Sequence, residues 1–307
     1  MVCDLNCPKF PVVQIEQVLA NMGHSVRKIV YLGSGDDSDT LLCDNSYVIK
    51  IPKRPAVYLA QQREFALYAF FGRQKLSFVI PKALYQGETF NIMQFISGET
   101  ISYRDYSFLS EREKELLAED MAIFLRELHR IIIPAADKPF CEIIENKREK
   151  YCSDQTEILR VLESLNLLSG SLYEKILSIY DRIYSNAALF RYKPCLTHND
   201  FSTSNMVFRG NRLYGVIDFG DACIGDPDND FLCLLDCSTD DFGKNFGRKV
   251  LRHYGHPYPD LAERKAEIND AYWPIQQILL GEQREDEQLI QNGYNGLLNT
   301  EPESFVL

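Results

Sequence analysis

Two short polar segments in the second half of the chain constrain its fold more strongly than any other feature. The first, residues 197–205, carries a carboxylate at Asp200 and an amide at Asn205. The second begins with the apolar run 213–217 and continues with Asp218, which Phe and Gly follow. The gap between Asn205 and Asp218 has the length of a β-hairpin. The chain is therefore expected to form a polar loop, a hairpin and a second polar turn, in that order.

The three polar side chains of these segments suit the transfer of a phosphoryl group from a nucleotide. That reaction needs a base that orients the attacking hydroxyl and two oxygen ligands that hold Mg²⁺ on the phosphates. The order base, amide, strand, Asp-Phe-Gly matches the catalytic-loop and metal-loop signature of protein kinases. Asp-Phe-Gly alone also occurs by chance at strand-to-turn boundaries. Together and in this order, the two segments predict a kinase.

The composition narrows the classes of protein to which the chain can belong. Its 307 residues allow one large or two medium domains. The net charge of −11 argues against a nucleic-acid or anionic-membrane partner and is compatible with a cationic ligand. No apolar run approaches membrane-spanning length, and the first residues lack the pattern of a signal peptide. We therefore expect a cytoplasmic protein with no membrane partner.

The cysteine pattern agrees with a reducing compartment. The nine cysteines are odd in number and scattered, and Cys43 and Cys233 lie in apolar stretches. This distribution predicts reduced, buried thiols. Cys3/Cys7 and Cys233/Cys237 lack Cys or His partners at zinc-finger spacing, so no zinc site is expected.

The first third of the chain predicts strands with one helix. Apolar, β-branched segments alternate with turn residues such as Asp44-Asn45, and Pro52 and Pro55 end one strand. Ser97-Gly98 then interrupts the pattern. The expected strands are 26–32, 40–42, 47–51, 78–84 and 90–95, and the expected helix is 57–71, which carries Glu64.

The remainder of the chain is expected to be mostly helical. Ser110 and Glu113 form a capping-box pair before an amphipathic helix that Pro134 should terminate. A β-rich first third followed by an α-rich remainder predicts two lobes, with a junction near 94–98. Further helices are expected twice within 141–190, most clearly over 172–184, then over 246–254, and over 261–281 with a break at Pro274.

In a two-lobed kinase the small lobe must hold the triphosphate. Gly33-Ser34-Gly35 follows a predicted strand and can bring backbone amides close to phosphate oxygens, because Gly lacks a Cβ. The third Gly of the usual fingerprint is missing, with Ser38 near its place, so an ordinary hairpin turn is the alternative.

Lys50 is the predicted phosphate-binding cation. It lies in the apolar strand 47–51, where a charge is costly unless it is paired. Glu64 on the following helix is the expected partner, and the pair would aim the ammonium at the α- and β-phosphates. Lys53 competes for this role, but Pro52 has already ended the strand, which favours Lys50.

The chain resembles a known family along nearly its whole length. The residues that carry the resemblance are 47–53, 124–129, 194–202, 217–231 and 271–273, and the block 197–231 is the most specific. It is similar to the aminoglycoside phosphotransferases, relatives of protein kinases and choline kinases, and within them most closely to the 2''-O-phosphotransferases.

The resemblance implies roles for individual residues. Asp200 would be the catalytic base, and Asn205 and Asp218 would be Mg²⁺ ligands. Lys50 would bind phosphate, oriented by Glu64. His198 and Asp230 would hold the catalytic loop through hydrogen bonds to its backbone, and Asp221 is left open. The segment Gln94-Phe95-Ile96 would read the purine of ATP or GTP through its backbone, with Met93 shaping the inner wall of the pocket.

The predicted substrate-binding residues are acids and one tryptophan. Aminoglycosides are polycations, so carboxylates facing one cleft would pair with their ammonium groups. Trp273 could offer a flat face to a sugar ring, although a lone Trp is more often a core residue. For the acids, a solvated helix surface is the alternative. The candidate acids are Asp236, Asp240, Asp241 and Asp270, with Glu267 on the same helix as Asp270.

These observations predict an α+β, bilobal protein-kinase-like fold with a small β-rich N-lobe and a large, mostly helical C-lobe. The N-terminal nucleotide-binding lobe would be 1–95. The C-terminal catalytic lobe, 96–307, would contain a helical substrate-binding subdomain at about 135–190 and 257–307. We expect a monomeric, Mg²⁺-dependent nucleotide:aminoglycoside O-phosphotransferase that confers antibiotic resistance.

Two alternatives remain at this stage. One is a kinase of the same fold acting on a macrolide, choline, a sugar or homoserine. Choline kinases would favour an aromatic-lined cation site over a spread of acids. The other is a pseudokinase that serves as a binding module, against which the complete set Lys50, Glu64, Asp200, Asn205 and Asp218 argues.

Overall fold

The computed structural model describes residues 10–35, 37–134, 144–236 and 241–306. Contacts divide the chain into two units. In the described segments, no helix is both long and apolar enough to cross a membrane. The first unit comprises Met1–Ile101, Ile133–Glu142 and Ser204–Ala222, and the second comprises Ser102–Ile132, Ile143–Thr203 and Cys223–Leu307.

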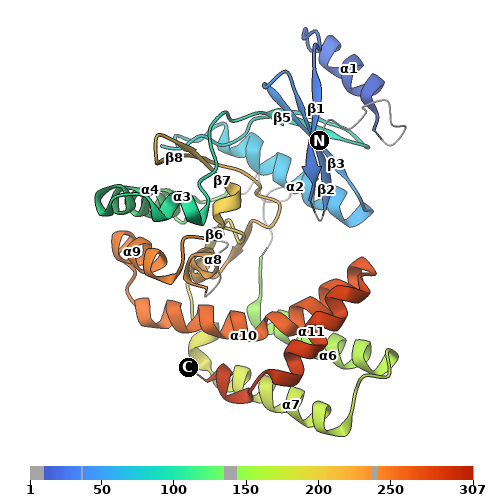
Figure 1. Ribbon diagram of the computed structural model, residues 1–307, viewed down its shortest axis with the longest axis vertical. Coiled ribbons are helices and arrows are strands. Elements are labelled where there is room, and N and C mark those ends of the chain that lie inside the picture. The colour runs from blue at the N-terminus through green and yellow to red at the C-terminus, as the bar shows by residue number, and fades with distance from the viewer. Residues whose placement is uncertain (1–9, 36, 135–143, 237–240, 307) are drawn as a thin grey trace. The chain divides into compact units, whose positions relative to one another are not determined.

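The first unit is built on a five-stranded antiparallel sheet with the strand order β1-β2-β3-β5-β4 (Figure 1). Asp44 and Asn45, which join β2 to β3, both have positive φ, as a tight hairpin turn requires. The predicted turn is confirmed there. The strands are β1 (Ile29–Ser34), β2 (Ser38–Cys43), β3 (Tyr47–Pro52), β4 (Ala83–Gln86) and β5 (Asn91–Gln94).

The two faces of this sheet have different neighbours. One face, which includes Ile49, packs against helix α1 (Val12–Asn21). Because side chains alternate between the two faces along a strand, the neighbouring Lys50 lies on the opposite face. Helix α2 (Pro55–Phe71) starts with Pro at its first turn and packs against β3 and β4. The apolar cluster under α1 includes Ile15, Leu19, Leu41, Ile49 and Ile92.

A hairpin follows the polar loop, as predicted. It consists of β7 (Met206–Arg209) and β8 (Arg212–Val216), and it belongs to the first unit. Gly215 of this hairpin pairs with Val79. A Cβ at Gly215 would lie 2.6 Å from the Val79 carbonyl oxygen, so only glycine allows the two backbones to approach this closely.

The second unit is mostly helical. A two-stranded sheet of β6 (Cys195–Thr197) and β9 (Cys223–Gly225) precedes its functional loops. Short 3₁₀ segments lie at Ala187–Phe190, Pro227–Phe231 and Pro302–Phe305. The helices are α3 (Tyr103–Ser107), α4 (Glu111–Leu128), α6 (Lys147–Ser164), α7 (Gly170–Ser185), α8 (Leu232–Leu235), α9 (Lys244–Tyr254), α10 (Pro259–Arg284) and α11 (Glu287–Asn299).

One hydrophobic core of this unit lies among α6, α7, α10 and α11 (Figure 1). Buried tyrosines in it have partners for their hydroxyl groups. The hydroxyls of Tyr180 and Tyr272 lie 2.8 Å apart, and Tyr272 donates to Asp154 at 2.9 Å. Satisfying these polar atoms allows large aromatic side chains to fill the core at little polar cost.

The α+β class is confirmed, with the sheet in the first unit and a helical second unit. The predicted capping box of Ser110 and Glu113 is also confirmed. The prediction that Pro134 ends this helix is wrong, because α4 already ends at Leu128. The predicted strand 78–84 is shifted, because Val79 forms only an isolated bridge and β4 starts at Ala83.

The predicted break at Pro274 is wrong, since α10 runs without interruption from Pro259 to Arg284. Pro274 packs against α11, where a Cβ at Gly296 would lie 2.9 Å from its Cγ. Tertiary packing of this kind overrides the local cost of proline inside a helix. Helices α1 and α11 have no counterpart among the predicted elements.

Close packing of α9 on α8 predicts a strong effect of a single methyl group. A Cβ at Gly247 would lie 2.2 Å from the Leu234 carbonyl oxygen. We expect Gly247→Ala to lower the free energy of unfolding by about 1–3 kcal/mol, the cost of overpacking. In Gly170→Ala, the new Cβ would meet no described atom within 4 Å, so this matched helical variant should be neutral or slightly stabilising. Urea denaturation of both variants checks this, and equal stabilities would contradict it.

Candidate functional site

Lys50 is held between two carboxylates. Its ammonium nitrogen lies 3.0 and 3.1 Å from the two carboxylate oxygens of Glu64 and 2.9 Å from Oδ1 of Asp218. Burial alone would lower the pKa of Lys50, but Glu64 and Asp218 outweigh burial and the net shift is upward. The expected Lys–Glu pair is present, and Lys50 keeps its charge. The competing Lys53 is exposed and donates to the Gly35 carbonyl oxygen.

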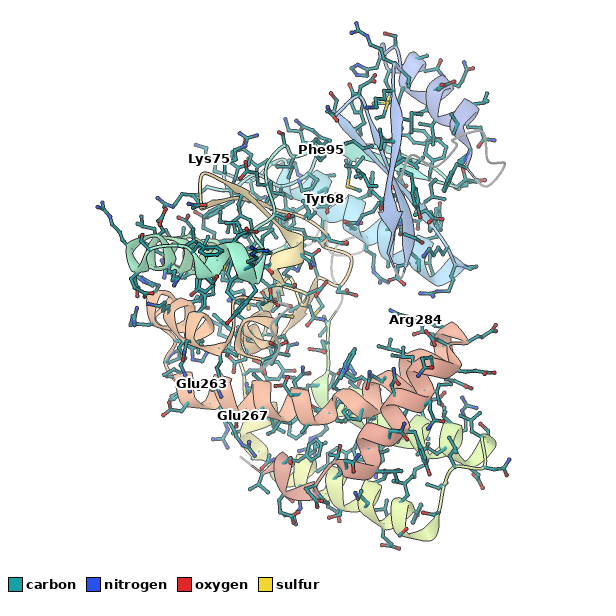
Figure 2. All side chains as sticks on the ribbon, viewed as in Figure 1. Tyr68, Lys75, Phe95, Glu263, Glu267 and Arg284 are labelled. Carbon is teal, nitrogen blue, oxygen red and sulfur yellow. The ribbon has the colours of Figure 1, made fainter. Side chains whose placement is uncertain are left out.

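Helix α2 positions the carboxylate partner of Lys50. Glu64 is 1% exposed and also accepts a hydrogen bond from the Tyr68 hydroxyl at 2.6 Å. The same hydroxyl accepts from the backbone N–H of Asp218 at 3.1 Å. Burial raises the pKa of Tyr68 well above its ordinary value, with Glu64 adding to the effect, so the hydroxyl stays protonated. Tyr68 is labelled in Figure 2.

Two oxygen donors of the first unit suit a magnesium ion. Asp218 follows β8, and its side chain remains 47% exposed although it contacts Lys50. Asn205 is linked to the same turn, because its carbonyl accepts from the Ile217 N–H at 2.9 Å. No group of three or more His, Cys, Asp or Glu suits a metal within the described segments. One carboxylate and one amide are enough for Mg²⁺, which keeps several waters and phosphate oxygens as ligands.

The predicted nucleotide-binding backbone is also in the first unit. Gly33 and Ser34 end β1, and the Gly35 N–H donates to the Ser38 carbonyl at 3.0 Å. The side chain of Gln61, on α2, donates to the Ser38 hydroxyl at 2.7 Å. The helix that carries Glu64 therefore also fixes the end of the glycine turn.

The predicted purine-reading segment follows β5. Met93 is 4% exposed and pairs with Val48, so it shares a sheet face with Lys50. The N–H groups of Gln94 and Phe95 donate to the carbonyls of Lys82 and Ser46. For the Ile96 N–H, no backbone acceptor exists among the described residues, which leaves this group for a ligand.

Two buried carboxylates hold the loop on either side of Asp200. Asp230 is fully buried and accepts from the backbone N–H groups of His198 at 3.0 Å and Asn199 at 2.6 Å. The backbone role predicted for Asp230 is therefore present. Asp241, 3% exposed, accepts from the Thr203 N–H. Asp200 itself is half-buried.

His198 is distinguished by its burial and Asn199 by its left-handed backbone. His198 is fully buried, with its ring edge-on to Phe201 at a centroid distance of 6.0 Å. Asn199 has φ +66°, in the left-handed region, and its side-chain oxygen accepts from the Asn229 amide at 2.9 Å. Asn tolerates this backbone better than most residues.

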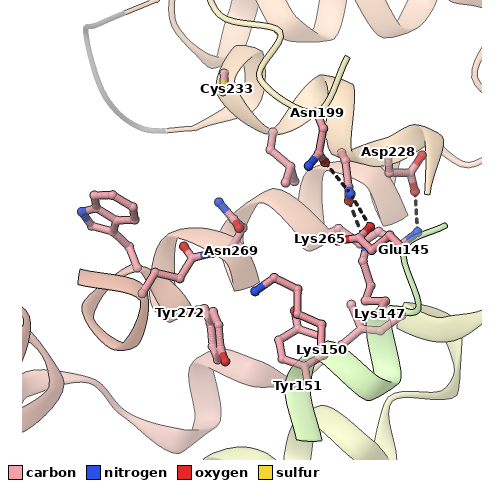
Figure 3. Close-up of a pocket in the computed structure, with 15 residues that line it drawn as sticks. Glu145, Lys147, Lys150, Tyr151, Asn199, Asp228, Cys233, Lys265, Asn269 and Tyr272 are labelled. Atoms are coloured by element: carbon pink, nitrogen blue, oxygen red, sulfur yellow. Dashed lines mark hydrogen bonds and ion pairs between the residues drawn. The ribbon is translucent and has the colours of Figure 1, made fainter. Parts of the chain in front are cut away.

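The second unit contains a cavity of about 260 Å³ beside this loop (Figure 3). Trp273, 47% exposed, is one of the residues that line it. The other lining residues include Asn199, Cys233, Asn269, Tyr272, Gln276, Lys147, Lys150 and Tyr151. Sequence reasoning missed Asn269, Tyr272 and Gln276, although with Trp273 they recur at the spacing of one helix face and mix polar with aromatic groups.

The predicted substrate acids are placed differently from one another. Asp236 and Asp270 are half-buried and do not line this cavity, and Asp241 holds the loop. Asp240 lies outside the described residues. Glu267, labelled on α10 in Figure 2, is paired with Lys244 and Arg264. The acids that line the cavity are instead Glu145 and Asp228.

A buried charge network supports the cavity wall. Lys265, 5% exposed, bonds to Asp226 at 2.8 Å and Asp228 at 2.6 Å, and Lys147 bonds to Asp226 at 2.7 Å. Burial alone would raise the pKa of Asp228, but hydrogen bonds from His256 and Lys265 outweigh it and hold the pKa at about 2. The network ties α6 and α10 to the turn after β9.

The predicted residues thus fall into two sets. Within the first unit, Lys50, Glu64 and Asp218 are in direct contact. Asp200 and the carboxylates that hold its loop belong to the second unit. The first set combines an ammonium group with carboxylate oxygens, and the second contains a half-buried carboxylate in a loop whose Asn199 lines the polar, aromatic cavity.

The chain matches a known protein family and is similar to solved structures. The sequence profile of the phosphotransferase enzyme family (APH) matches residues 28–266. The aminoglycoside 3'-phosphotransferases of Salmonella typhimurium and Escherichia coli are each 23% identical over 160 residues, which cover 48% of this chain and 52% of theirs. The chain therefore spans about half the length of the curated relatives that it matches.

Three solved structures are similar over almost the whole chain, each at 50% identity and 97% coverage of it. They are a gentamicin complex of APH(2'')-IIa (TM-score 0.93, 99% of that chain), ADP-bound APH(2'')-Ib (TM-score 0.90, 100%) and a streptomycin–ATP complex of APH(2'')-IIa (TM-score 0.91, 99%).

Proposed function

The chain belongs to the phosphotransferase enzyme family, and on that premise we propose that it transfers the γ-phosphate of ATP or GTP to an aminoglycoside hydroxyl, the 2'' position. The observation that carries the proposal is the buried Lys50 ammonium between Glu64 and Asp218, at 2.9–3.1 Å. The likeness to 2''-phosphotransferases at 50% identity supports the choice of acceptor. Such a reaction would inactivate the antibiotic and so confer resistance.

We assign nucleotide binding to the lobe 1–95 with the metal loop. Lys50 would bind the α- and β-phosphates, as the Lys of kinases does. The Ile96 N–H would donate to the purine, with Met93 at the inner wall, and Gly33, Ser34 and Gly35 would face the phosphates. Asn205 and Asp218 would hold Mg²⁺, which when bound neutralises charge on the transferred phosphoryl group.

We assign acceptor binding to the catalytic lobe 96–307, with its helical subdomain at about 135–190 and 257–307. Asp200 would take the proton of the attacking hydroxyl while the hydroxyl oxygen forms a bond to the γ-phosphorus. The bond from that phosphorus to the bridging oxygen breaks, and the diphosphate leaves. Trp273 would stack on a sugar ring. Asp236, Asp240 and Asp270 would attract ammonium groups, whereas Asp241 would act through the loop that it holds.

We also propose that the protein acts as a monomer in the cytoplasm. The cysteines that the structure describes support a reducing environment, because they are free thiols: Cys43, Cys152, Cys195, Cys223 and Cys233. The proposal as a whole is tested by nucleotide turnover with gentamicin- and kanamycin-type aminoglycosides, choline and a macrolide. Turnover of choline or the macrolide alone would replace the proposed substrate class.

Asp200→Ala should abolish transfer while nucleotide binding survives. Asp200 orients the acceptor in this proposal, whereas the phosphates are held by Lys50 and the metal ligands. Loss of a general base costs at least ~10² in rate. Steady-state turnover and nucleotide titration measure the two properties. The exposed Asp181→Ala is the control and should behave like wild type. Turnover near the wild-type rate in Asp200→Ala would refute the assignment.

The nucleotide pocket should accept both ATP and GTP. Met93 is unbranched and adaptable, so it should exclude neither purine as a rigid aromatic ring would. We expect kcat/KM values for the two nucleotides within ~10³ of each other, which corresponds to about 4 kcal/mol. Steady-state kinetics with each donor decides, and a larger preference for either one would show that the pocket selects the base.

The acidic residues should separate into two kinetic classes. Asp236→Asn and Asp270→Asn should raise KM for the aminoglycoside, each by the equivalent of about 1–3 kcal/mol for a paired carboxylate, and less so at high salt. Asp241→Ala should instead lower kcat with little change in KM, because the Thr203 N–H loses its acceptor. KM for nucleotide should stay constant in all of them. Unchanged KM in both Asn variants would exclude these acids from the acceptor site.

A further inference from the structure

Tyr68 occupies an unusual position for an aromatic residue on a packed helix. It is 1% exposed, and its hydroxyl has two partners, the Glu64 carboxylate at 2.6 Å and the backbone N–H of Asp218 at 3.1 Å. An amide N–H can only donate, so the hydroxyl accepts from Asp218 and gives its single proton to Glu64. Both hydrogen-bonding roles of the hydroxyl are therefore fixed.

These contacts close a ring of four residues. Lys50 bonds to Glu64 at 3.0 Å, Glu64 to Tyr68 at 2.6 Å, Tyr68 to the Asp218 backbone at 3.1 Å, and the Asp218 carboxylate to Lys50 at 2.9 Å. Within this ring, Tyr68 holds Asp218 through its backbone and Lys50 holds it through its side chain. Of these two contacts, the one with Lys50 competes with a metal ion for the carboxylate.

The backbone of Asp218 needs such support. Its φ is +64°, in the left-handed region that residues with a side chain seldom adopt. The next residue, Phe219, packs edge-on against Tyr68 at 6.0 Å and Phe71 at 4.9 Å between ring centroids. Helix α2 therefore fixes both the strained residue and its successor, the first by a hydrogen bond and the second by aromatic packing.

We propose that Tyr68 is a positioning residue for the metal ligand Asp218, an inference that rests on the proposed phosphotransferase function. When the Asp218 carboxylate exchanges Lys50 for the metal ion, the Tyr68 hydroxyl keeps the Asp218 backbone in its left-handed conformation. The same hydroxyl keeps Glu64 oriented toward Lys50, so that the ammonium released by Asp218 is available to the phosphates. One hydroxyl would thereby couple metal binding to phosphate binding.

The test is Tyr68→Phe, which removes the hydroxyl and retains the ring that packs on Phe219. Calorimetric titration with the β,γ-imido analogues of ATP and GTP is performed over a series of MgCl₂ concentrations and in EDTA. We expect the Mg²⁺ concentration that half-restores nucleotide affinity to rise about tenfold, as loss of one buried hydrogen bond implies. Affinity in EDTA should be unchanged, and excess Mg²⁺ should restore kcat.

Tyr58→Phe is the matched control, since Tyr58 lies on the same helix and its hydroxyl has no hydrogen bond to any described residue. An unchanged Mg²⁺ dependence in Tyr68→Phe would overturn the inference. An equal loss of affinity in EDTA would also overturn it, because it would mark a general effect on folding. A wild-type protein whose nucleotide binding ignores Mg²⁺ would refute the proposed function itself, and the inference with it.

If Tyr68→Phe does not fold, amide hydrogen exchange of the wild type decides the question. The Asp218 N–H should exchange slowly in the metal-free protein, because the buried Tyr68 hydroxyl accepts its hydrogen bond. Rapid exchange at this amide, with slow exchange in neighbouring β8, would overturn the inference.

Discussion

The buried ammonium of Lys50 is the constraint on which the first unit depends. A lysine side chain only 14% exposed is costly to desolvate unless carboxylates surround it. Glu64 from α2 and Asp218 from the turn after β8 supply them, so the helix and the hairpin must both approach β3. One ammonium facing two carboxylates leaves a net negative charge. Under the proposed function, that excess charge would suit a divalent cation that arrives together with nucleotide phosphates.

In the second unit, carboxylates serve as partners of backbone N–H groups rather than of a buried ammonium group. After β6 the chain leaves regular structure, and its N–H groups need acceptors because they are buried. Asp230 and Asp241 provide charged acceptors at both ends of the loop, which form stronger hydrogen bonds than neutral ones. The His129 ring lies 2.9 Å from Oδ2 of Asp230, the oxygen that also accepts from the His198 N–H. The segment that carries Asp200 is thereby anchored on both sides, while Asp200 itself remains half-buried.

Much of the first unit follows from local sequence pattern. Most of the strands and the turn at Asp44-Asn45 were predictable, although the strand predicted over 78–84 was shifted. The pairing of Lys50 with Glu64 was predictable as well, because a charge in an apolar strand needs a partner nearby. The role of Tyr68 was not, since its second partner lies 150 residues further along the chain and on a helix Tyr68 reads as an ordinary core residue. Asp241 illustrates the opposite case. An acid in a run of polar residues suggests a solvated surface, and only the fold shows that it is buried against the Thr203 N–H.

Under the proposed function, the cavity of the second unit would have to accept a polycation although three lysines line it. Each lysine is already paired: Lys147 with Asp226, Lys265 with Asp226 and Asp228, and Lys150 with Asp154. Of these carboxylates only Asp228 lines the cavity, together with Glu145, whose carboxylate accepts from Asn229. Four carboxylates in and behind the wall therefore compensate the charge of its three ammonium groups. The lysines therefore act as structural counter-ions, and the surfaces left for a ligand are the amides and aromatic faces of α10, which suit a sugar ring better than an ammonium group. Attraction of the charged groups then falls to acids around the cavity and to the net charge of −11.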